Sequence, residues 1–375
     1  MAKVMVVGGG FAGVVAAESL AKKLEGKHEV TLVSRSRQFL FYPGLVRYAF
    51  GQCNLNELGF DLREAMLSRG VSFVQAEVGR IVPDDRKVII AGGDLTGEMP
   101  YDFLVLAFGR RLATERVTGF FENAHHLLSL NATRKFADAI DSFHQGHAVI
   151  GSCPGARLPV PLFETAFALS RILKLRDERS RCAITVVSDE TPAEMFGGAA
   201  ISEKLLESLK SHGIELVSDF SINQVTPTAI LASDGRAIDC NLRMLVPPFC
   251  GPSPVLYTGL TGAEGYVRVD AAMSVVGEKR VYAAGDCVSF PGPKLGHMAV
   301  RQGEVAAANL CAQIEARAQT AVYDHELMLV IDTSDHDSIF LHRELPTEGP
   351  ADVHQGRFWA WAKLQQERYW KATHD

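Results

Sequence analysis

The first residues of the chain pass from an apolar stretch through a glycine-rich turn to a helical pattern. Lys3–Val7 is apolar and β-branched, helical spacing runs from about Gly13 to Leu24, and Glu29–Ser34 has the pattern of a second strand. This order predicts a βαβ unit with two parallel strands.

The same order occurs again in the middle of the chain. Residues 147–150 predict a strand, residues 162–173 a helix, and Cys182–Val187 the next strand. Two such units predict an α/β fold with two Rossmann-like dinucleotide-binding domains. We expect a first domain from residues 1–110 and 266–320, a second from 111–265, and a C-terminal segment from 321–375.

The remaining apolar stretches predict further strands and helices of these two domains. Strands are predicted at 103–108, 214–217, 244–247 and 281–284, and helices near 58–69 and 297–317. With 47% hydrophobic and 22% charged residues the chain has a globular composition, and a net charge of -6 argues against nucleic acid as a partner. Seven scattered cysteines argue against a disulfide scaffold and for a reducing cytoplasm.

Gly8, Gly10 and Gly13 form a GxGxxG pattern between the first strand and the first helix. The first glycine permits a tight turn, the second lets the backbone approach a pyrophosphate, and the third lets the helix pack closely on the strand. The helix N-terminus adds partial positive charge, so these glycines, with Phe11 and Ala12, are candidate cofactor contacts. The strand-to-helix context disfavours the alternative of a glycine turn without a ligand.

One position departs from the dinucleotide-binding pattern. The second strand usually ends in an acid that bonds the adenosine ribose, whereas this chain has Ser34 and Arg35 there. Serine can still bond a hydroxyl, and arginine can stack on adenine or meet a phosphate. Both therefore stay candidate cofactor contacts.

Two later motifs resemble those of flavoproteins with two dinucleotide domains. AFGRR, which contains Ala107 and Gly109, follows a buried strand and resembles their ATG segment. VYAAGDC, which contains Gly285 and Asp286, resembles their second FAD signature, in which an aspartate holds the ribityl chain. Together with GxGxxG, these motifs imply FAD and a fold like that of glutathione reductase.

Four further segments resemble the sulfide:quinone oxidoreductases, which are related to flavocytochrome c sulfide dehydrogenases and type II NADH dehydrogenases. The segments are PLFETAFAL, MFGGAAISEKLLESLKSHGIEL, VPPFCGP and PKLGHMAVRQGEVAAANL. In that family the last segment lies beside the pyrimidine edge of the flavin and the quinone pocket. The resemblance implies that Lys294 stabilises the anionic reduced flavin and that Gly296 contacts the cofactor.

The second glycine-rich turn, GSCPGA at 151–156, is a poor nicotinamide site. Cys153 stands at the position of the second glycine, where a Cβ would obstruct a pyrophosphate. The next strand is followed by Ser188 where an acid is usual. NADH is therefore the disfavoured electron donor.

The resemblance fails at the redox cysteines. Sulfide:quinone oxidoreductases use two cysteines across the flavin face, and this chain places Leu158 at the first position and Val330 at or next to the second. Leucine cannot replace a thiolate nucleophile. Either Cys153 and Cys250, just beyond predicted strand ends, form a relocated redox pair, or both are packing residues and the scaffold oxidises another donor.

Glu164 matches the position of a helix glutamate in the same family. There it could relay a proton to or from quinone or flavin, and the alternative is a solvated helix charge. Cys153, Cys250, Glu164 and Lys294 are thus the candidate catalytic residues. The sequence shows no set of metal ligands at a suitable spacing.

The C-terminal stretch GRFWAWAKLQQERYWKATHD holds all three tryptophans among basic residues. Aromatic rings and cations at helical spacing predict a helix at a membrane interface, through which a quinone would enter. The alternative is a helix that packs these rings on its own core or on a dimer partner.

Taken together, the sequence predicts an FAD-dependent oxidoreductase that passes electrons from a reduced sulfur species, or another small donor, to a quinone. We expect it on the cytoplasmic face of a membrane, with no signal peptide or membrane span, and a homo-oligomer is left open. The rival interpretations are an NAD(P)H:quinone oxidoreductase on the same scaffold, and a non-catalytic flavoprotein that acts as a redox sensor or partner subunit.

Overall fold

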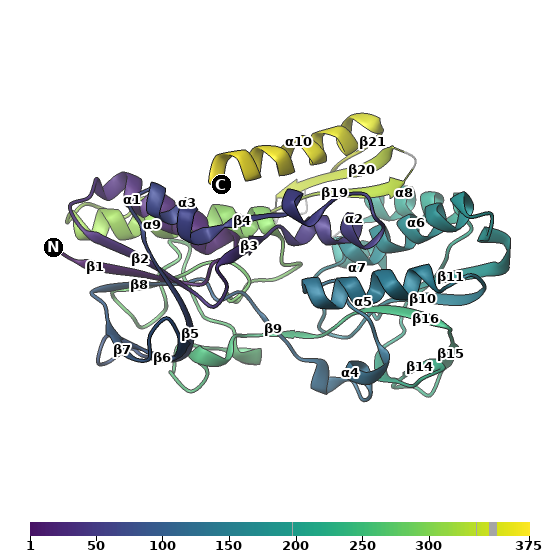
Figure 1. Ribbon diagram of the computed structural model, residues 1–375, viewed down its shortest axis with the longest axis horizontal. Coiled ribbons are helices and arrows are strands. Elements are labelled where there is room, and N and C mark those ends of the chain that lie inside the picture. The colour runs from purple at the N-terminus through teal and green to yellow at the C-terminus, as the bar shows by residue number, and fades with distance from the viewer. Residues whose placement is uncertain (197, 335, 345–350) are drawn as a thin grey trace.

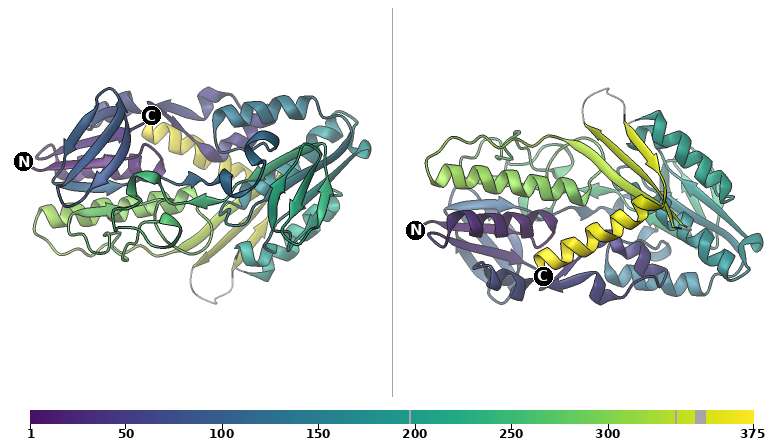
Figure 2. Two further views of the ribbon diagram at one scale, coloured as in Figure 1. Left: turned by 90° about the horizontal axis from the view of Figure 1, so that it is seen from below. Right: turned by 90° about the horizontal axis from the view of Figure 1, so that it is seen from above.

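The computed structural model describes residues 1–196, 198–334, 336–344 and 351–375. Two lobes lie side by side, and the C-terminal helix crosses over both of them (Figure 1). Seen from above, this helix runs diagonally from the second lobe towards the first (Figure 2).

The first lobe is built on a seven-stranded sheet of order β18-β8-β1-β2-β5-β6-β7. Its strands are β1 (Lys3–Val7), β2 (Glu29–Ser34), β5 (Ser72–Val82), β6 (Lys87–Gly93), β7 (Gly97–Pro100), β8 (Phe103–Leu106) and β18 (Val281–Ala283). The pairs from β18 to β5 are parallel, while β5, β6 and β7 form antiparallel pairs. The carboxyl ends of β1, β8 and β18 therefore meet at one edge of the sheet.

Two long helices, α1 (Phe11–Leu24) and α9 (Gly296–Ile314), pack against each other in this lobe. Their approach is so close that a Cβ on Gly303 of α9 would collide with the backbone of Ala12 in α1. Apolar residues of β1, β2 and β8 share one core cluster with both helices. This packing holds the N-terminal end of α1 rigidly above the strand ends.

The second lobe has a four-stranded parallel sheet of order β12-β11-β10-β16. Its strands and main helices are β10 (Gly146–Ser152), β11 (Cys182–Val187), β12 (Glu215–Val217), β16 (Leu242–Val246), α5 (Leu130–Asp141), α6 (Val160–Leu175) and α8 (Ala199–Ser211). A smaller antiparallel sheet consists of β13 (Ile222–Val225), β14 (Ala229–Ala232) and β15 (Ala237–Asp239). Phe136, Phe163 and Phe167 lie at the centre of the core of this lobe.

The chain enters the second lobe at β9 (Arg111–Leu112) and returns to the first at β17 (Phe249–Cys250). These two strands pair antiparallel, with Leu112 opposite Phe249 and Arg111 opposite Cys250. The remaining elements are short. They are β3 (Gln38–Leu40), β4 (Gly59–Asp61), α2 (Leu45–Ala49), α3 (Leu62–Ser68), α4 (Phe120–Asn123), α7 (Pro192–Phe196), and 3-10 turns at Tyr42–Gly44, Leu55–Glu57, Thr114–Arg116, Arg179–Arg181, Ser253–Val255 and Ala263–Gly265.

The C-terminal segment contains a three-stranded antiparallel sheet as well as the predicted helix. It consists of β19 (Glu326–Ser334), β20 (Asp337–Glu344), β21 (Asp352–Gln355) and α10 (Arg357–His374). The sequence analysis predicted the helix but not the sheet. Buried and half-buried side chains alternate along the whole of β19, which is the period of a strand with one covered face.

One face of α10 packs on the protein itself. Trp359 stacks on Phe340 with ring centroids 3.9 Å apart, and Trp370 lies 4.9 Å from the ring of Phe11. On the opposite face Phe358, Trp361 and Tyr369 are exposed, between 58% and 72% of their surface. The alternative, in which the rings pack on the protein's own core, therefore holds for one face, and three aromatic side chains remain exposed on the other. Among the described residues no helix has the length and apolarity needed to cross a bilayer.

Candidate active site

The first glycine-rich turn lies at the strand-end edge of the first lobe. Gly8 has φ +113°, and a Cβ there would collide with the carbonyl oxygen of Ala107. A Cβ on Gly13 would collide with the carbonyl oxygen of Gly8, so both positions exclude a side chain. Gly10, in contrast, faces open space, with nothing within 4 Å of the position of a Cβ. The turn is packed tightly underneath and left open where a dinucleotide would approach.

The N-terminus of α1 presents backbone donors to this open space. Gly10 is the N-cap and makes no side-chain capping hydrogen bond, so the first amides of the helix remain available to an anion. The ring of Phe11 points elsewhere and packs with Phe39, Phe41 and Trp370. Its backbone N–H is therefore the group that could meet a cofactor. Ala12 packs beneath Gly285, whose Cβ would lie 3.0 Å from that of Ala12.

The second strand ends beside the same turn. Ser34 is buried, its hydroxyl donates to the carbonyl oxygen of Ser36, and a Cβ on Gly9 would meet its side chain at 2.6 Å. Arg35 is exposed. Both residues lie at the edge where the adenosine half of a dinucleotide binds in such folds.

The neighbouring strands β8 and β18 bring the two flavin-like motifs together. Gly109 and Gly285 both have positive φ, +72° and +81°, and the N–H of Gly285 donates to Oε1 of Gln302 at 2.7 Å. Asp286 follows Gly285 just beyond the end of β18. Its carboxylate forms an ion pair with Arg110, which donates a hydrogen bond to it. A carboxylate and a guanidinium from separate motifs thus meet at the sheet edge that carries the glycine turn.

Arg110 is a residue that the sequence analysis did not single out. Its guanidinium lies 4.3 Å from the centre of the Phe249 ring, in the crossing strand β17. Its Nε is buried and has no hydrogen-bond partner within the described part of the chain. Its place directly after the ATG-like segment was the available signal, but only the pairing of β8 with β18 places it on Asp286.

Lys294 is almost fully buried close to the same carboxylate. Its Nζ donates to the carbonyl oxygen of Val288 at 2.8 Å and lies 4.2 Å and 4.1 Å from the ring centres of Tyr266 and Phe290. Burial lowers the pKa of Lys294 to about 7, and the nearby charge of Asp286 opposes this shift. This lysine is enclosed by a carbonyl oxygen and two aromatic rings, and no carboxylate of the described residues forms an ion pair with it.

Arg157 is a third cation at this place, and it too was missed from the sequence. Its Nε donates to the carbonyl oxygen of Gly292 at 2.7 Å, and its guanidinium lies 5.4 Å from the ring centre of Phe290. Its own carbonyl oxygen accepts from the backbone N–H of Lys294 at 2.8 Å. Burial lowers the pKa of Arg157, while nearby acidic groups raise it.

These features fit an FAD site. The open turn at Gly10 accommodates a pyrophosphate, Asp286 stands where the ribityl chain is held, and the unpaired Nε of Arg110 is a donor without an acceptor. Gly296, the first residue of α9, lies beside this turn, since its Cβ would contact the Phe11 ring at 3.4 Å.

The second glycine-rich turn has a different construction. Residues 153–159 separate β10 from α6, so the helix does not begin directly after the strand as α1 does. The amide of Cys153 already donates to the carbonyl oxygen of Val246 at 2.9 Å, and that of Ala156 donates to the carbonyl oxygen of Cys153 at 2.9 Å. These amides are used inside the protein, and Pro159 caps α6 without a side-chain hydrogen bond. The turn therefore offers no phosphate cradle like that of the first lobe.

The two candidate redox cysteines are both buried free thiols. Cys153 has no exposed surface and lies in an apolar cluster with Phe120 and Val149. Burial raises the pKa of the Cys153 thiol well above its ordinary range. Cys250 is buried in β17, with its sulfur 3.9 Å from the carbonyl oxygen of Arg111. The apolar environment of Cys153 does not favour a thiolate.

Glu164 is neither exposed nor unpaired. It is 5% exposed on α6, forms an ion pair with Lys363 of α10, and accepts the backbone N–H of Asp332 in β19 at 2.9 Å. Lys363 also donates to the carbonyl oxygen of Val330 at 3.2 Å. Burial raises the pKa of Glu164, and the charge of Lys363 opposes the shift. The alternative of a solvated helix charge is wrong, because α10 and β19 cover this face of α6.

The two positions at which the sequence analysis expected redox cysteines carry apolar side chains in the structure. Leu158 is half-buried and packs against the core of the second lobe. Val330 lies in β19, and its carbonyl oxygen accepts from Lys363. The ion pair of Glu164 and Lys363 therefore lies directly beside the second position.

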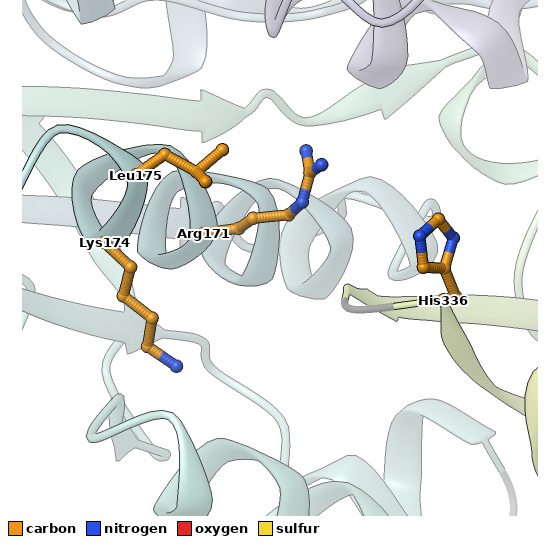
Figure 3. Close-up of a pocket in the computed structure, with 4 residues that line it drawn as sticks. All are labelled: Arg171, Lys174, Leu175 and His336. Carbon is orange, nitrogen blue, oxygen red and sulfur yellow. The ribbon is translucent and has the colours of Figure 1, made fainter.

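A separate hollow of about 330 Å³ lies between α6 and the residue before β20, lined by Arg171, Lys174, Leu175 and His336. Figure 3 shows that Arg171 and Lys174 extend from α6 in different directions. The side chains do not converge on one point, so the hollow lacks the convergent polar groups of a ligand site. Within the described part of the chain no cluster of acidic, histidine and cysteine side chains could hold a metal ion.

Comparison with known proteins agrees with this geometry. A sulfide-quinone reductase from Aquifex aeolicus is 25% identical over 304 residues, which span 78% of this chain and 70% of the relative. A type II NADH:quinone oxidoreductase from Staphylococcus aureus is 20% identical over 370 residues, 92% of this chain and 91% of the relative. The solved structure of the sulfide:quinone oxidoreductase from Aquifex aeolicus matches with a TM-score of 0.89 and 22% identity, over 98% of this chain and 90% of that one.

The predicted resemblance to sulfide:quinone oxidoreductases and the predicted fold class are thus confirmed. The pyridine nucleotide-disulphide oxidoreductase family model matches residues 2–303, which include both glycine-rich turns, Asp286 and Lys294. The chain belongs to the pyridine nucleotide-disulphide oxidoreductase family and is an FAD-dependent oxidoreductase.

Proposed function

We propose that this protein oxidises a reduced sulfur species and delivers the electrons to a quinone. The similarity to sulfide:quinone oxidoreductases over most of the chain supports this reaction. One structural observation favours it over the NADH alternative. In the second glycine-rich turn the amides of Cys153 and Ala156 donate to carbonyl oxygens of the protein, so they are not available to a pyrophosphate. A small donor needs no such turn, whereas a nicotinamide dinucleotide does.

FAD, when bound, accepts two electrons from a donor and passes them to an acceptor. For the protein we propose that the amides after β1 hold the pyrophosphate and that Asp286 holds the ribityl chain. Lys294 supplies positive charge beside the flavin, and Glu164 handles a proton near the position of the second redox cysteine. The raised pKa of Glu164 supports this last role, because a carboxyl with a raised pKa holds a proton more readily than an ordinary one.

The division into an FAD domain, a second dinucleotide-type domain and a C-terminal segment is also a proposal. The seven-stranded sheet and the four-stranded sheet draw their strands from the residue ranges expected for the two domains. The crossing strands β9 and β17 are the natural boundary between them.

The donor can be identified by reducing the flavin under anaerobic conditions. The purified FAD-loaded protein is mixed with sulfide, and separately with NADH, while absorbance is followed at about 450 nm. Rapid bleaching by sulfide, followed by reoxidation on addition of a quinone analogue, is the expected result. Rapid bleaching by NADH alone would instead identify an NADH:quinone oxidoreductase, and no turnover with either donor would favour the non-catalytic flavoprotein.

The relocated redox pair Cys153 and Cys250 stays a hypothesis, and burial of both thiols supports the packing alternative. A variant with Cys153→Ala and Cys250→Ala separates the two interpretations. If the cysteines only pack, the double variant retains sulfide-dependent bleaching within about threefold of the wild type, a difference of under 1 kcal/mol. Loss of bleaching by about a hundredfold or more, with FAD still bound, would make the thiols part of the chemistry.

We further propose that the exposed face of α10 contacts a membrane surface, where a quinone is dissolved. Phe358, Trp361 and Tyr369 are exposed on it, and exposed aromatic rings are favourable at the headgroup level. The wild type should float with phospholipid vesicles, and a Phe358→Ser, Trp361→Ser variant should remain in solution. Phe121→Ser is the matched control, since Phe121 is 87% exposed but lies on α4. Equal flotation of both variants would refute the assignment of this face.

A further inference from the structure

The carboxylate expected to hold the flavin is already neutralised by the protein. Arg110 pairs with Asp286, and both side chains retain some exposure, 16% and 14%. Arg157 and Lys294 stand close by, around the rings of Tyr266 and Phe290. Glu264 also acts on Arg157, and it pairs with Arg116 at 3.8 Å. The two carboxylates therefore lie among three arginines, with Lys294 close by, and the positive charge exceeds the negative charge.

The excess of positive charge requires a ligand that supplies negative charge. Among the residues that the structure describes, the partners of Lys294 are a carbonyl oxygen and two ring faces, and the buried Nε of Arg110 has no hydrogen-bond partner. Buried cations without counter-ions are destabilising unless an anion accompanies them. FAD at this edge provides one, because the reduced flavin ring is an anion whereas the oxidised ring is neutral.

We infer that Arg110 is a positioning residue for the flavin whose charge makes the site prefer the reduced cofactor to the oxidised one. It does so while it is held between Asp286 of the first lobe and the Phe249 ring of the crossing strand β17. The inference rests on FAD occupying the site described above. It concerns a residue of this chain for which the family motifs imply no role.

The neighbouring Arg111 provides a matched control. Both arginines follow Gly109, but Arg111 pairs with Glu115 at 2.7 Å and its side chain is 39% exposed. A general effect of removing a positive charge would appear in both variants. An effect of the Asp286 site appears only at Arg110.

The test compares the two-electron midpoint potential of bound FAD, measured by reductive titration with dithionite, with the affinity for oxidised FAD, measured by fluorescence. Arg110→Met should lower the preference for reduced over oxidised FAD by about tenfold or more. This corresponds to a midpoint potential that is lower by about 30 mV for a two-electron couple. Arg110→Lys, which keeps the charge, should lower it by less than about threefold, and Arg111→Met should leave it unchanged.

Two results would overturn the inference. One is an unchanged potential in Arg110→Met, and the other is an equal loss in Arg110→Lys and Arg110→Met, which would mean that the arginine only shapes the crossing strand. Should Arg110→Met fail to fold, Arg110→Lys alone tests the inference. A lower midpoint potential of FAD in that variant, which keeps the charge, would refute a role of charge. Dithionite needs no natural donor, so an absence of sulfide turnover leaves this test intact. A wild type that takes up no FAD would instead refute the cofactor assignment.

Discussion

Replacing Lys363 with methionine leaves Glu164 buried without its cation. The two residues join α10 to α6, and Glu164 is 5% exposed whereas the side chain of Lys363 is 26% exposed. Methionine keeps most of the length and the helix propensity of lysine, so the change removes the charge with little effect on packing. The folded protein must then bury an unpaired carboxylate or protonate it.

Protonation sets the upper limit of the cost. A carboxyl with an ordinary pKa of about 4.4 needs roughly 1.36 kcal/mol per pH unit to be held protonated, which is about 3.5 kcal/mol at pH 7. Loss of one partner from a buried pair costs about 3–5 kcal/mol when the other is trapped as an ion. We therefore expect Lys363→Met to destabilise the docking of α10 by about 3 kcal/mol at pH 7.

The dependence on pH has a definite sign. In the variant the folded state keeps Glu164 protonated where the unfolded chain ionises it, so the folded state binds more protons between about pH 4.4 and 7. Its stability is then highest at low pH and falls as the pH rises. At pH 5.5 the deficit should have shrunk by about 2 kcal/mol, since 1.5 pH units correspond to that amount.

The assay uses a property of this chain. Trp359, Trp361 and Trp370 are the only tryptophans, and all three lie in α10, so tryptophan emission in urea reports the docking of this helix. Arg368→Met is the matched control, because Arg368 is exposed on the same helix, and its effect should stay within about 0.5 kcal/mol. The double variant Glu164→Gln, Lys363→Met should recover most of the loss. A deficit no larger than that of Arg368→Met, or one that grows at low pH, would refute the reasoning.

Three further changes test the site and the helix. Gly13→Ala should prevent folding of the first lobe, since its Cβ collides with the backbone of Gly8, whereas Gly10→Ala should fold normally and bind FAD about tenfold or more weakly; thermal melting and flavin fluorescence check both. Burial lowers the pKa of Lys294 to about 7 from 10.5, so the unfolded chain binds more protons and the stability of the wild type rises with pH between these values; urea unfolding at pH 7 and pH 9 should show this rise, and Lys294→Met should lack it. Trp370→Ala should cost about 2 kcal/mol in urea unfolding, roughly half the value for a fully buried ring.

The local periodicity of the chain was sufficient to predict the elements around the first turn. The strands β2 and β11 have the predicted bounds, and α1 begins two residues earlier than expected, at Phe11. Gly8 and Gly13 could be assigned their steric roles from the motif alone, because a turn between a strand and a helix imposes the same constraints in every protein of this kind. The C-terminal sheet was not predicted, although side chains in β19 alternate between buried and half-buried with the period of a strand.

Which charged side chains meet at the site could be seen only in the tertiary structure. Arg110 and Asp286 lie 176 positions apart, and Glu164 and Lys363 lie 199 apart. Their meeting depends on which strands are neighbours in the sheet and on the path of α10 over both lobes. A pattern along the chain specifies which face of an element is apolar, but not which distant element covers it. For that reason the sequence by itself identified the cofactor turn and the fold class, while only the assembled structure revealed the cations around Asp286 and the partner of Glu164.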